Sequence, residues 1–428
     1  MAFTLRSTYL QSWSTAGQEK EGIAAENLLL PENGLLLHIG PHKTGTTAIQ
    51  GAFHLARERL AARGVFYPGR GRQPLLAVLA VTGQPALLGE GRPSMKRWDG
   101  LAAALRARDG QRVVLSSEFF AEANDAEARR VVEDLGGPRA HVVVTLRPLT
   151  RILPSQWQQY IQNGYRMPYV EWLDGILSDP PHTPTPGFWV RHRHDTLVAR
   201  WAGAAGPANV TVIVVDERDR SSLLRTFEAM LGLPRGFLVP EDDTANRSLT
   251  RPEAELVRRL NEEFTRREWP DRDYAKFVRY GAVQQMKSRQ PPPGEPKITM
   301  PGWALERAAA IGAEMADNIA GLGVRVIGDI ASLGKRPESA AGGDTDTAGS
   351  GTDTAGADTA GGDTAGSDAP AVPSDAAVQA MLGAFMAGGA GSSDAADIMR
   401  DVDTKSITRV LMQRGRHKLG QALHLTSQ

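Results

Sequence analysis

The sequence predicts an α/β protein built on a P-loop-type, mostly parallel sheet flanked by helices. Short apolar runs alternate with segments of helical period from Leu35 to about Leu333. The first apolar run leads directly into a glycine-bearing turn at the head of a helix. Such alternation is typical of βαβ units, in which helices cover both faces of a parallel sheet. A disordered linker and a small helical C-terminal tail are expected after this region.

The individual elements follow from their patterns. The run 34–40, GLLLHIG, predicts a buried strand, and 46–64 predicts an amphipathic helix that ends at Gly64, the favoured C-terminal stop. Further patterns predict buried strands at 112–120, 141–148 and 209–217, helices at 125–137 and 152–164, and a short late strand at 323–330.

Composition divides the chain into four parts. Residues 1–33 have no strong period and are interpreted as a loose leader, whereas 34–335 form the folded domain. Residues 336–374 carry four copies of Asp-Thr-Ala-Gly and almost no bulky apolar side chain, which predicts a disordered linker. Residues 375–428 regain apolar patterns with a basic end. They predict two or three short helices, more typical of a segment that binds a protein partner than of an independent domain.

Charge and cysteine content exclude several classes. Lys plus Arg and Asp plus Glu both total 49, so the net charge gives no reason to expect a nucleic-acid partner. The absence of cysteine excludes thiol catalysis, disulfides and cysteine-ligated zinc. The first residues contain no apolar signal core, and no apolar run approaches the roughly 18–20 residues of a membrane helix. We therefore expect a cytoplasmic protein without a membrane span.

The turn after the first strand carries the chemistry. Residues 40–47 read GPHKTGTT, and Gly40 and Gly45 have the spacing of a Walker A loop. Thr46 takes the usual place of the lysine, and Lys43 sits at the loop apex. Backbone N–H groups and the dipole of the following helix favour an anion at such a turn. We predict phosphate or sulfate binding by Gly40, Pro41, His42, Lys43, Thr44, Gly45, Thr46 and Thr47.

A P-loop kinase or NTPase is an alternative. Those enzymes need the Walker lysine and an aspartate that helps to hold magnesium. The lysine position is absent, and the runs 112–120 and 141–148 do not end in aspartate. Asp216 does lie at the end of the run 209–217, which keeps this alternative open.

The loop "PHKTGTT" resembles the 5′-phosphosulfate loop of sulfotransferases, which use 3′-phosphoadenosine 5′-phosphosulfate (PAPS). Their second signature, a strand-end arginine and a serine eight positions later, is matched by Arg147 and Ser155 in "TLRPLTRILPSQW". A guanidinium fork and a helical hydroxyl can converge on the 3′-phosphate. Looser similarity extends over roughly 33–335 and is closer to the bacterial and carbohydrate-modifying branches. The late Arg-Lys-Gly loop is missing, and Asn246, Arg247 and Ser248 are the candidate substitutes.

The resemblance implies sulfuryl transfer from PAPS to a hydroxyl of a carbohydrate, lipid or metabolite acceptor. Lys43 would stabilise charge on the leaving oxygen, so that no metal is required. Glu118, beside Phe119 and Phe120, is the predicted base because partial desolvation makes a carboxylate a stronger base. His42 is the alternative base, and Glu118 could instead cap the next helix or pair with an arginine.

The acceptor contacts are expected between Ser155 and Trp201. Aromatic side chains with polar tips suit a small-molecule or glycan acceptor, although packing within the insertion is the alternative role for each. These residues are Tyr160, Tyr165, Trp172, His182, Trp189, His192 and His194. No metal is expected at His192 and His194, because no further ligand stands at a recognised spacing. A non-catalytic nucleotide-fold protein that recruits a partner through its tail is the remaining alternative.

Overall fold

A computed structural model describes residues 28–86, 91–180, 182, 185, 187–241, 247–336 and 372–389. These residues form two compact units. With the gaps just given, the first contains 28–157, 167–241 and 299–336, and the second contains 158–166, 247–298 and 372–389. Most of the predicted leader and linker, and the tail beyond 389, lie outside the described residues.

A six-stranded sheet with the strand order β2-β3-β1-β4-β5-β6 forms the centre of the first unit, and every pairing is parallel. This confirms the predicted fold class. The strands are β1 (Leu35–Ile39), β2 (Val65–Phe66), β3 (Arg112–Ser116), β4 (Ala140–Leu146), β5 (Val210–Val214) and β6 (Arg325–Ile327). The pattern did not predict β2, because two residues are too few to show a period.

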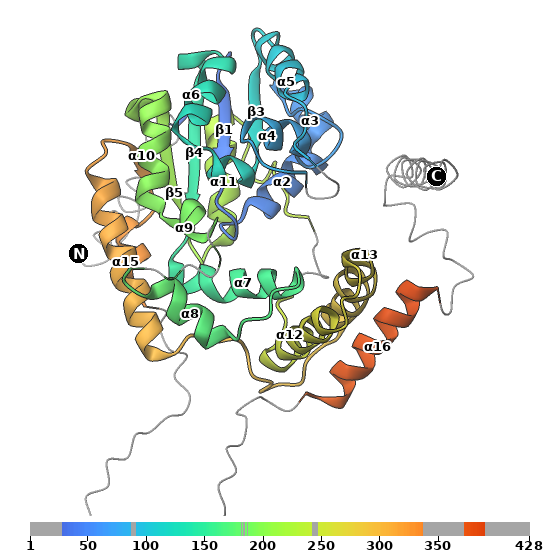
Figure 1. Cartoon of the computed structure of the whole chain (residues 1–428). Coiled ribbons are helices and arrows are strands. Elements are labelled where there is room, and N and C mark those ends of the chain that lie inside the picture. The colour runs from blue at the N-terminus through green and yellow to red at the C-terminus, as the bar shows by residue number, and fades with distance from the viewer. Residues whose placement is uncertain are drawn as a thin grey trace, which may run out of the picture. The chain divides into compact units, whose positions relative to one another are not determined.

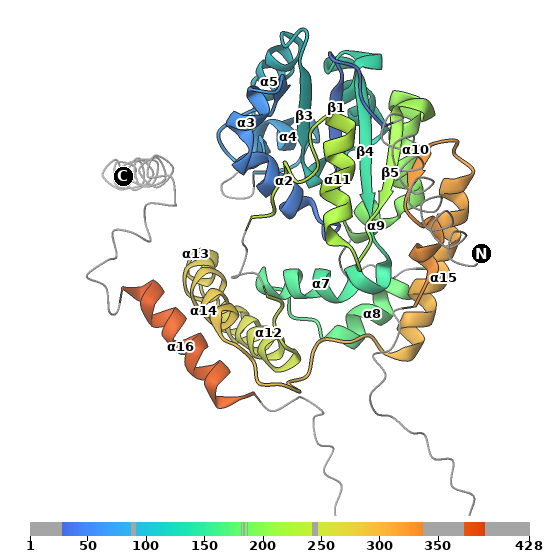
Figure 2. The ribbon, with the colours of Figure 1, turned by 180° about the vertical axis from the view of Figure 1, so that it is seen from behind.

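Helices cover both faces of this sheet (Figures 1 and 2). Successive strand residues point to opposite faces, so Leu35 and Leu37 pack on one side and Leu36 on the other. The first face is covered by α4 (Leu75–Val81), α5 (Lys96–Arg106), α6 (Asp125–Asp134), α10 (His194–Ala205) and α15 (Gly302–Ala320). The opposite face is covered by α2 (Thr46–Leu55), α3 (Arg57–Ala61) and α11 (Arg220–Leu231). The strands are apolar on both sides because neither face meets water.

The predicted helix over 46–64 is interrupted. Helix α2 ends at Leu55, Ala56 has φ −88° and ψ 2°, and α3 then occupies Arg57–Ala61. The predicted helix over 152–164 instead begins earlier, as α7 (Leu149–Gln162). The remaining elements of the first unit are α8 (Tyr169–Leu177), α9 (Gly187–His192), η1 (Glu118–Glu122), η2 (Gly137–Arg139), η3 (Pro207–Asn209) and η5 (Ile330–Gly334). No helix in the described ranges combines the length and apolar character needed to cross a bilayer.

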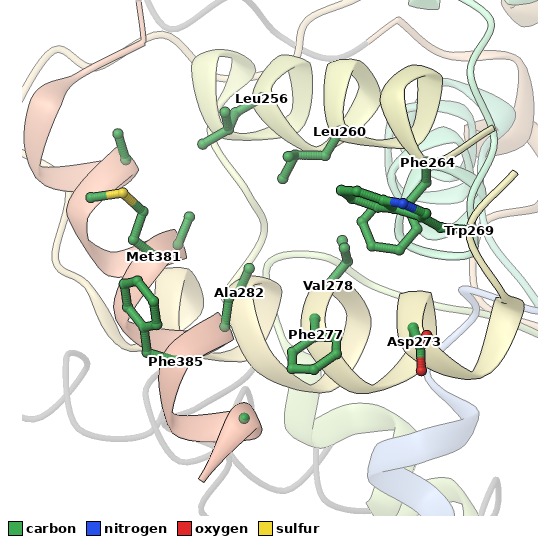
Figure 3. Close-up of a pocket in the computed structure, with 14 residues that line it drawn as sticks. Leu256, Leu260, Phe264, Trp269, Asp273, Phe277, Val278, Ala282, Met381 and Phe385 are labelled. Atoms are coloured by element: carbon green, nitrogen blue, oxygen red, sulfur yellow. The ribbon is translucent and has the colours of Figure 1, made fainter. Parts of the chain in front are cut away.

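The second unit is helical. It contains α12 (Arg251–Arg266), α13 (Asp271–Asp273), the π-helical η4 (Tyr274–Ala282), α14 (Val283–Ser288) and α16 (Ser374–Gly388). Helix α16 packs on η4 and α14, and an apolar groove lies between α12, η4 and α16 (Figure 3). A Cβ on Gly383 would come within 2.4 Å of the Gly281 carbonyl oxygen, so this close approach requires glycine. The first helix predicted within 375–428 is therefore packed into a folded unit.

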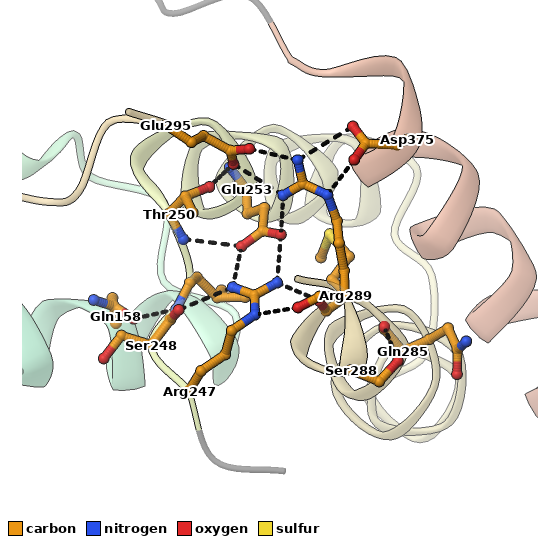
Figure 4. A network of polar contacts seen from close by, with 12 residues as sticks. Gln158, Arg247, Ser248, Thr250, Glu253, Gln285, Ser288, Arg289, Glu295 and Asp375 are labelled. Carbon is orange, nitrogen blue, oxygen red and sulfur yellow. Dashed lines mark hydrogen bonds and ion pairs between the residues drawn. The ribbon is translucent and has the colours of Figure 1, made fainter. Parts of the chain in front are cut away.

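A buried network of charges joins the helices of this unit (Figure 4). Glu253, which is fully buried, accepts hydrogen bonds from both terminal nitrogens of Arg247 and from Arg289 Nη1. Its carboxylate also accepts the backbone N–H of Thr250 and completes the capping box of α12. Arg289 in turn pairs with Asp375 at the start of α16. The network thus fixes the start of α12 and the start of α16 to the same guanidinium.

Removal of the charge of Glu253 should destabilise the second unit strongly. Glu253→Gln leaves the buried guanidinium of Arg289 and the partly buried one of Arg247 with reduced compensation, and breaking a buried pair costs about 3–5 kcal/mol. Urea unfolding followed by circular dichroism measures this cost. Glu263→Gln, an exposed carboxylate of the same helix, is the control and should unfold like the wild type. Equal midpoints for the two variants would contradict this account of the network.

Candidate functional site

Sterics fix the shape of the loop between β1 and α2. A Cβ on Gly40 would lie 2.0 Å from Thr46 Oγ1 and 2.8 Å from Thr145 Oγ1, so only glycine fits. Gly45 has φ 94° and is the N-cap of α2. Lys43 has φ 73°, in the left-handed region that residues with a Cβ seldom adopt. Such strain is retained where the surrounding structure imposes it, often at functional sites.

A chain of buried hydrogen bonds holds this loop to the sheet. His38 in β1 shares hydrogen bonds with Ser116 Oγ of β3 (2.8 Å) and Thr145 Oγ1 of β4 (3.1 Å). The Thr145 hydroxyl also contacts Thr44 Oγ1 at 2.9 Å, and Thr44 Oγ1 donates to the Pro41 carbonyl at 2.8 Å. All four side chains are fully buried. The chain therefore crosses three neighbouring strands and ends inside the loop.

Some hydrogen-bond donors of the loop are used within the loop, and others are left for a ligand. The hydroxyl and the backbone N–H of Thr44 are both used within the loop, with Pro41 O as acceptor. The Thr46 hydroxyl lies 3.4 Å from Gly40 O, and Thr47 is exposed. The first N–H groups of α2 have no intrahelical acceptor, as at every helix start. The backbone N–H groups of Gly45, Thr46 and Thr47 and the exposed hydroxyl of Thr47 are thus the donors that remain for a ligand.

Arg147 lies against the same loop. It follows β4 directly, and its Nη1 donates to the Lys43 carbonyl oxygen at 3.3 Å. Its Nε and Nη2 pair with Glu217, which follows β5, with 2.7 Å between Nη2 and Oε2. The contact lies between β1 and β4, where the chain leaves the two strands towards opposite edges of the sheet; ligands of open α/β sheets bind at such points. The predicted loop and the arginine of the second predicted motif are therefore in contact.

The serine of the arginine–serine signature, Ser155, does not contact its arginine. Ser155 is half-buried on α7, and the described residues contain no hydrogen bond between Ser155 and Arg147. Its role in binding a 3′-phosphate stays a prediction.

Glu118 is tied to the helix that follows the loop. Its Oε2 accepts from Gln50 Nε2 of α2 at 3.0 Å, and its Oε1 accepts from Gln73 Nε2 at 3.2 Å. Gln73 Oε1 in turn accepts from Ser117 Oγ at 2.6 Å. The capping alternative for Glu118 does not apply, because Asn124 and Glu127 form the capping box of α6. Neither Gln50 nor Gln73 was predicted, because neither stands in a motif.

The environment of His42 keeps its imidazole neutral. Burial, together with the nearby positive charges of Arg191 and Lys43, lowers the pKa of His42 to about 3. Its ring meets Phe119 edge-on at 5.4 Å between ring centroids. His42 Nδ1 is buried and has no hydrogen-bond partner among the described residues. A ring with so low a pKa is a weak base near neutral pH.

Helix α9 contributes two side chains near the loop. Burial and the charges of His194, Arg191, His42 and Lys43 lower the pKa of the fully buried His192 well below its usual value. Arg191, which no pattern predicted, pairs with Glu122 of η1 at 3.1 Å. By contrast, the indole N–H groups of Trp172 and Trp189 donate to Thr185 Oγ1 and Ile176 O. These two tryptophans pack the insertion, which was the alternative role.

The segment proposed to replace the Arg-Lys-Gly loop is only partly described. Asn246 lies outside the described residues, and Arg247 and Ser248 belong to the second unit. The guanidinium of Arg247 donates to the carbonyls of Arg289, Ser248 and Met286 and twice to Glu253. A guanidinium has five N–H groups, so a phosphate would have to displace one of these acceptors. Nucleotide binding by Asn246, Arg247 and Ser248 remains a prediction.

Asp216, the aspartate that kept the NTPase alternative open, binds only the backbone nearby among the described residues. Asp216 is exposed, and its Oδ1 accepts the backbone N–H of Arg218 at 2.8 Å. It follows β5, which is separated from the loop strand β1 by β4. Within the described part of the chain, no three His, Asp or Glu side chains gather as a metal site would require.

The fold and the site together define a parallel α/β protein with a glycine-bearing strand–loop–helix turn and a strand-end arginine beside it. No protein-family model matches the chain. No curated protein matches it either. Among solved structures it is similar to a sulfotransferase from Alicyclobacillus acidocaldarius, with 16% identity and a TM-score of 0.40 over 68% of this chain and 95% of that one. A similarity of this size identifies no function.

The buried chain through His38 predicts a pH dependence of stability. Burial lowers the pKa of His38 to about 3, whereas the unfolded ring binds a proton near pH 6.5. The unfolded state therefore holds more protons between these values, and stability falls as the pH decreases from about 6.5 towards 3. His38→Gln should remove up to about 1.4 kcal/mol per pH unit from this slope. Urea unfolding at a series of pH values measures it.

His182→Gln is the control for this experiment, because His182 is exposed. It should keep the wild-type slope. If His38→Gln also keeps that slope, His38 does not stay neutral in the folded protein as the structure implies.

Proposed function

We propose that the chain is a sulfotransferase that moves a sulfuryl group from PAPS to a hydroxyl of a small-molecule or glycan acceptor. The observation that supports the proposal most is the contact between the Arg147 guanidinium and the Lys43 carbonyl. This contact places the cation of Arg147 beside the loop that is proposed to bind the anion. PAPS carries negative charge at both its 5′-phosphosulfate and its 3′-phosphate. Adjacent cationic elements at a sheet edge suit such a donor.

The residues present fit the donor. The Gly40 and Gly45 turn and the N-terminus of α2 form a cradle for a phosphate or sulfate, with Lys43 at its apex. Arg147 would exchange its pairing with Glu217 for the 3′-phosphate, assisted by Ser155. Both side chains of this ion pair are about a quarter exposed, at 25% and 28%. Glu217 thus keeps contact with water and can be hydrated when the pair opens.

Lys43 and Glu118 act on different atoms during the transfer. The acceptor oxygen forms a bond to sulfur as the bond between sulfur and the bridging oxygen of adenosine 3′,5′-bisphosphate breaks. The Lys43 ammonium stabilises the charge that develops on the bridging oxygen. Glu118 accepts the acceptor's proton, while Gln50 and Gln73 hold its two carboxylate oxygens in place. His42 is the alternative base, and its pKa of about 3 makes it the weaker of the two candidates.

Nucleotide preference tests the donor. Adenosine 3′,5′-bisphosphate should raise the melting temperature of the full chain, whereas ATP with magnesium should not. A ligand at about a hundred times its Kd stabilises the folded state by about 2.7 kcal/mol, which is measurable by thermal shift. Arg147→Ala and Lys43→Ala should each weaken the shift, and Arg97→Ala, at an exposed position of α5, is the control. A shift with ATP and magnesium alone would favour the P-loop kinase or NTPase.

Transfer of labelled sulfate from PAPS to fractionated cell extract tests the chemistry. Lys43→Ala should lower the rate by about 10²–10³, because a placed donor at the leaving oxygen is lost. Glu118→Gln should lower it by about 10²–10⁴ while the shift with adenosine 3′,5′-bisphosphate is kept. The exposed Glu58→Gln on α3 is the control.

Two outcomes would change the proposal. Full turnover by Glu118→Gln would remove Glu118 from the role of base and leave the donor site intact. A nucleotide shift without sulfate transfer to any fraction would favour the non-catalytic binding protein.

A further inference from the structure

The second unit presents an apolar groove with a volume of about 830 Å³ (Figure 3). Helices α12 and η4 form two of its walls and α16 forms the third. Asp273 is the one charged residue among those that line it in the described part of the chain. The larger apolar side chains in the lining are Leu256, Leu260, Phe264, Trp269, Phe277 and Phe385.

Large apolar side chains at this groove are exposed. Phe385 is 63% exposed, Met381 56% and Trp269 48%. The small residues Ala376, Ala380 and Gly383 are buried where α16 packs on the rest of the unit. A contiguous exposed apolar surface of this kind marks a site of interaction.

The wall formed by α16 is held in place by specific contacts. Arg289 pairs with Asp375 at the start of the helix, and Gln285 donates to Gln379 at 2.9 Å. Further along, Gly383 packs directly on Gly281 of η4. These contacts hold α16 in place, so the groove is preformed.

The sequence that follows α16 contains an apolar segment. Helix α16 ends at Gly388, which lines the groove, and Gly389 has φ 98° as its C-cap. Residues 390–397 are small or polar, and apolar residues then return at helical spacing. They form two groups, Ile398, Met399 and Val402, and Ile407, Val410 and Leu411. The connection 390–397 has a length usual between packed helices, about 2–8 residues.

We propose that residues 398–411 of the same chain bind in this groove and cover its apolar side chains. A short tether gives the segment an effective concentration in the millimolar range, which favours it over a second copy of the chain. Its apolar residues would contact Trp269, Met381 and Phe385, and its charged residues, among them Lys405 and Arg409, would face water. The inference does not depend on the proposed enzymatic function.

Engineered cysteines test this placement cleanly, because the chain has no cysteine of its own. Met381→Cys combined with Val410→Cys in the full chain should form an intramolecular disulfide under mild oxidation. The control pair joins Val410→Cys to Ser288→Cys, an exposed position of α14 that does not line the groove. Non-reducing gels and mass spectrometry of tryptic peptides measure the yield, which should exceed the control several-fold.

A yield no higher than the control would overturn the proposal. A disulfide formed mainly between two chains would overturn it too, since the occupant would then be a second copy.

A dye that fluoresces on apolar surfaces gives a second readout. The wild type should bind 1-anilinonaphthalene-8-sulfonate weakly, and Ile407→Asp with Leu411→Asp should raise the fluorescence several-fold and lower the melting temperature. Thr408→Asp with Gln413→Asp changes the charge equally and should do neither. If the wild type already binds the dye as strongly as the first variant, the groove is open to a lipid-like ligand and the proposal fails.

Discussion

The buried hydrogen-bond chain from Ser116 through His38 and Thr145 to Thr44 is the constraint on which the site depends. An unpaired buried polar group costs about 1–3 kcal/mol, so each member holds the next in place. Since the chain crosses β3, β1 and β4, the register of the sheet sets the position of the loop. The crowded position of Gly40 and the left-handed backbone of Lys43 follow from that fixed geometry.

Glu217 holds the guanidinium of Arg147 in a fixed orientation beside this loop. The guanidinium contacts the loop backbone at Lys43 while a partly exposed carboxylate balances its charge. An anionic ligand would take over the pairing with Arg147, and the released carboxylate of Glu217 would be hydrated through its exposed part. The same logic does not extend to Arg247, whose acceptors include the fully buried Glu253.

The two units are stabilised in different ways. The first relies on a parallel sheet with apolar residues on both faces, whereas the second combines a buried charge network with a glycine-to-glycine helix contact. The network includes Asp375, so a residue beyond the predicted linker contributes to the unit that contains Arg247 and Ser248. If residues 398–411 bind as proposed, they complete the apolar part of the same unit.

The sequence alone determined every strand of the sheet except β2, and the helix after the glycine turn. It also identified Lys43 as the cation of the loop and Arg147 as a cation at a strand end. These features follow from periodicity and turn chemistry, which are local properties of the chain. Tertiary structure decided that Arg147 contacts Lys43, that Gln50 and Gln73 hold Glu118, and that Arg247 is turned towards Glu253. Most of these partners lie tens of residues or more apart in the sequence. Arg247 and Glu253 are close in the sequence, but their contact is part of a network that includes Arg289. Strand order and helix packing bring them together, and no local pattern encodes either.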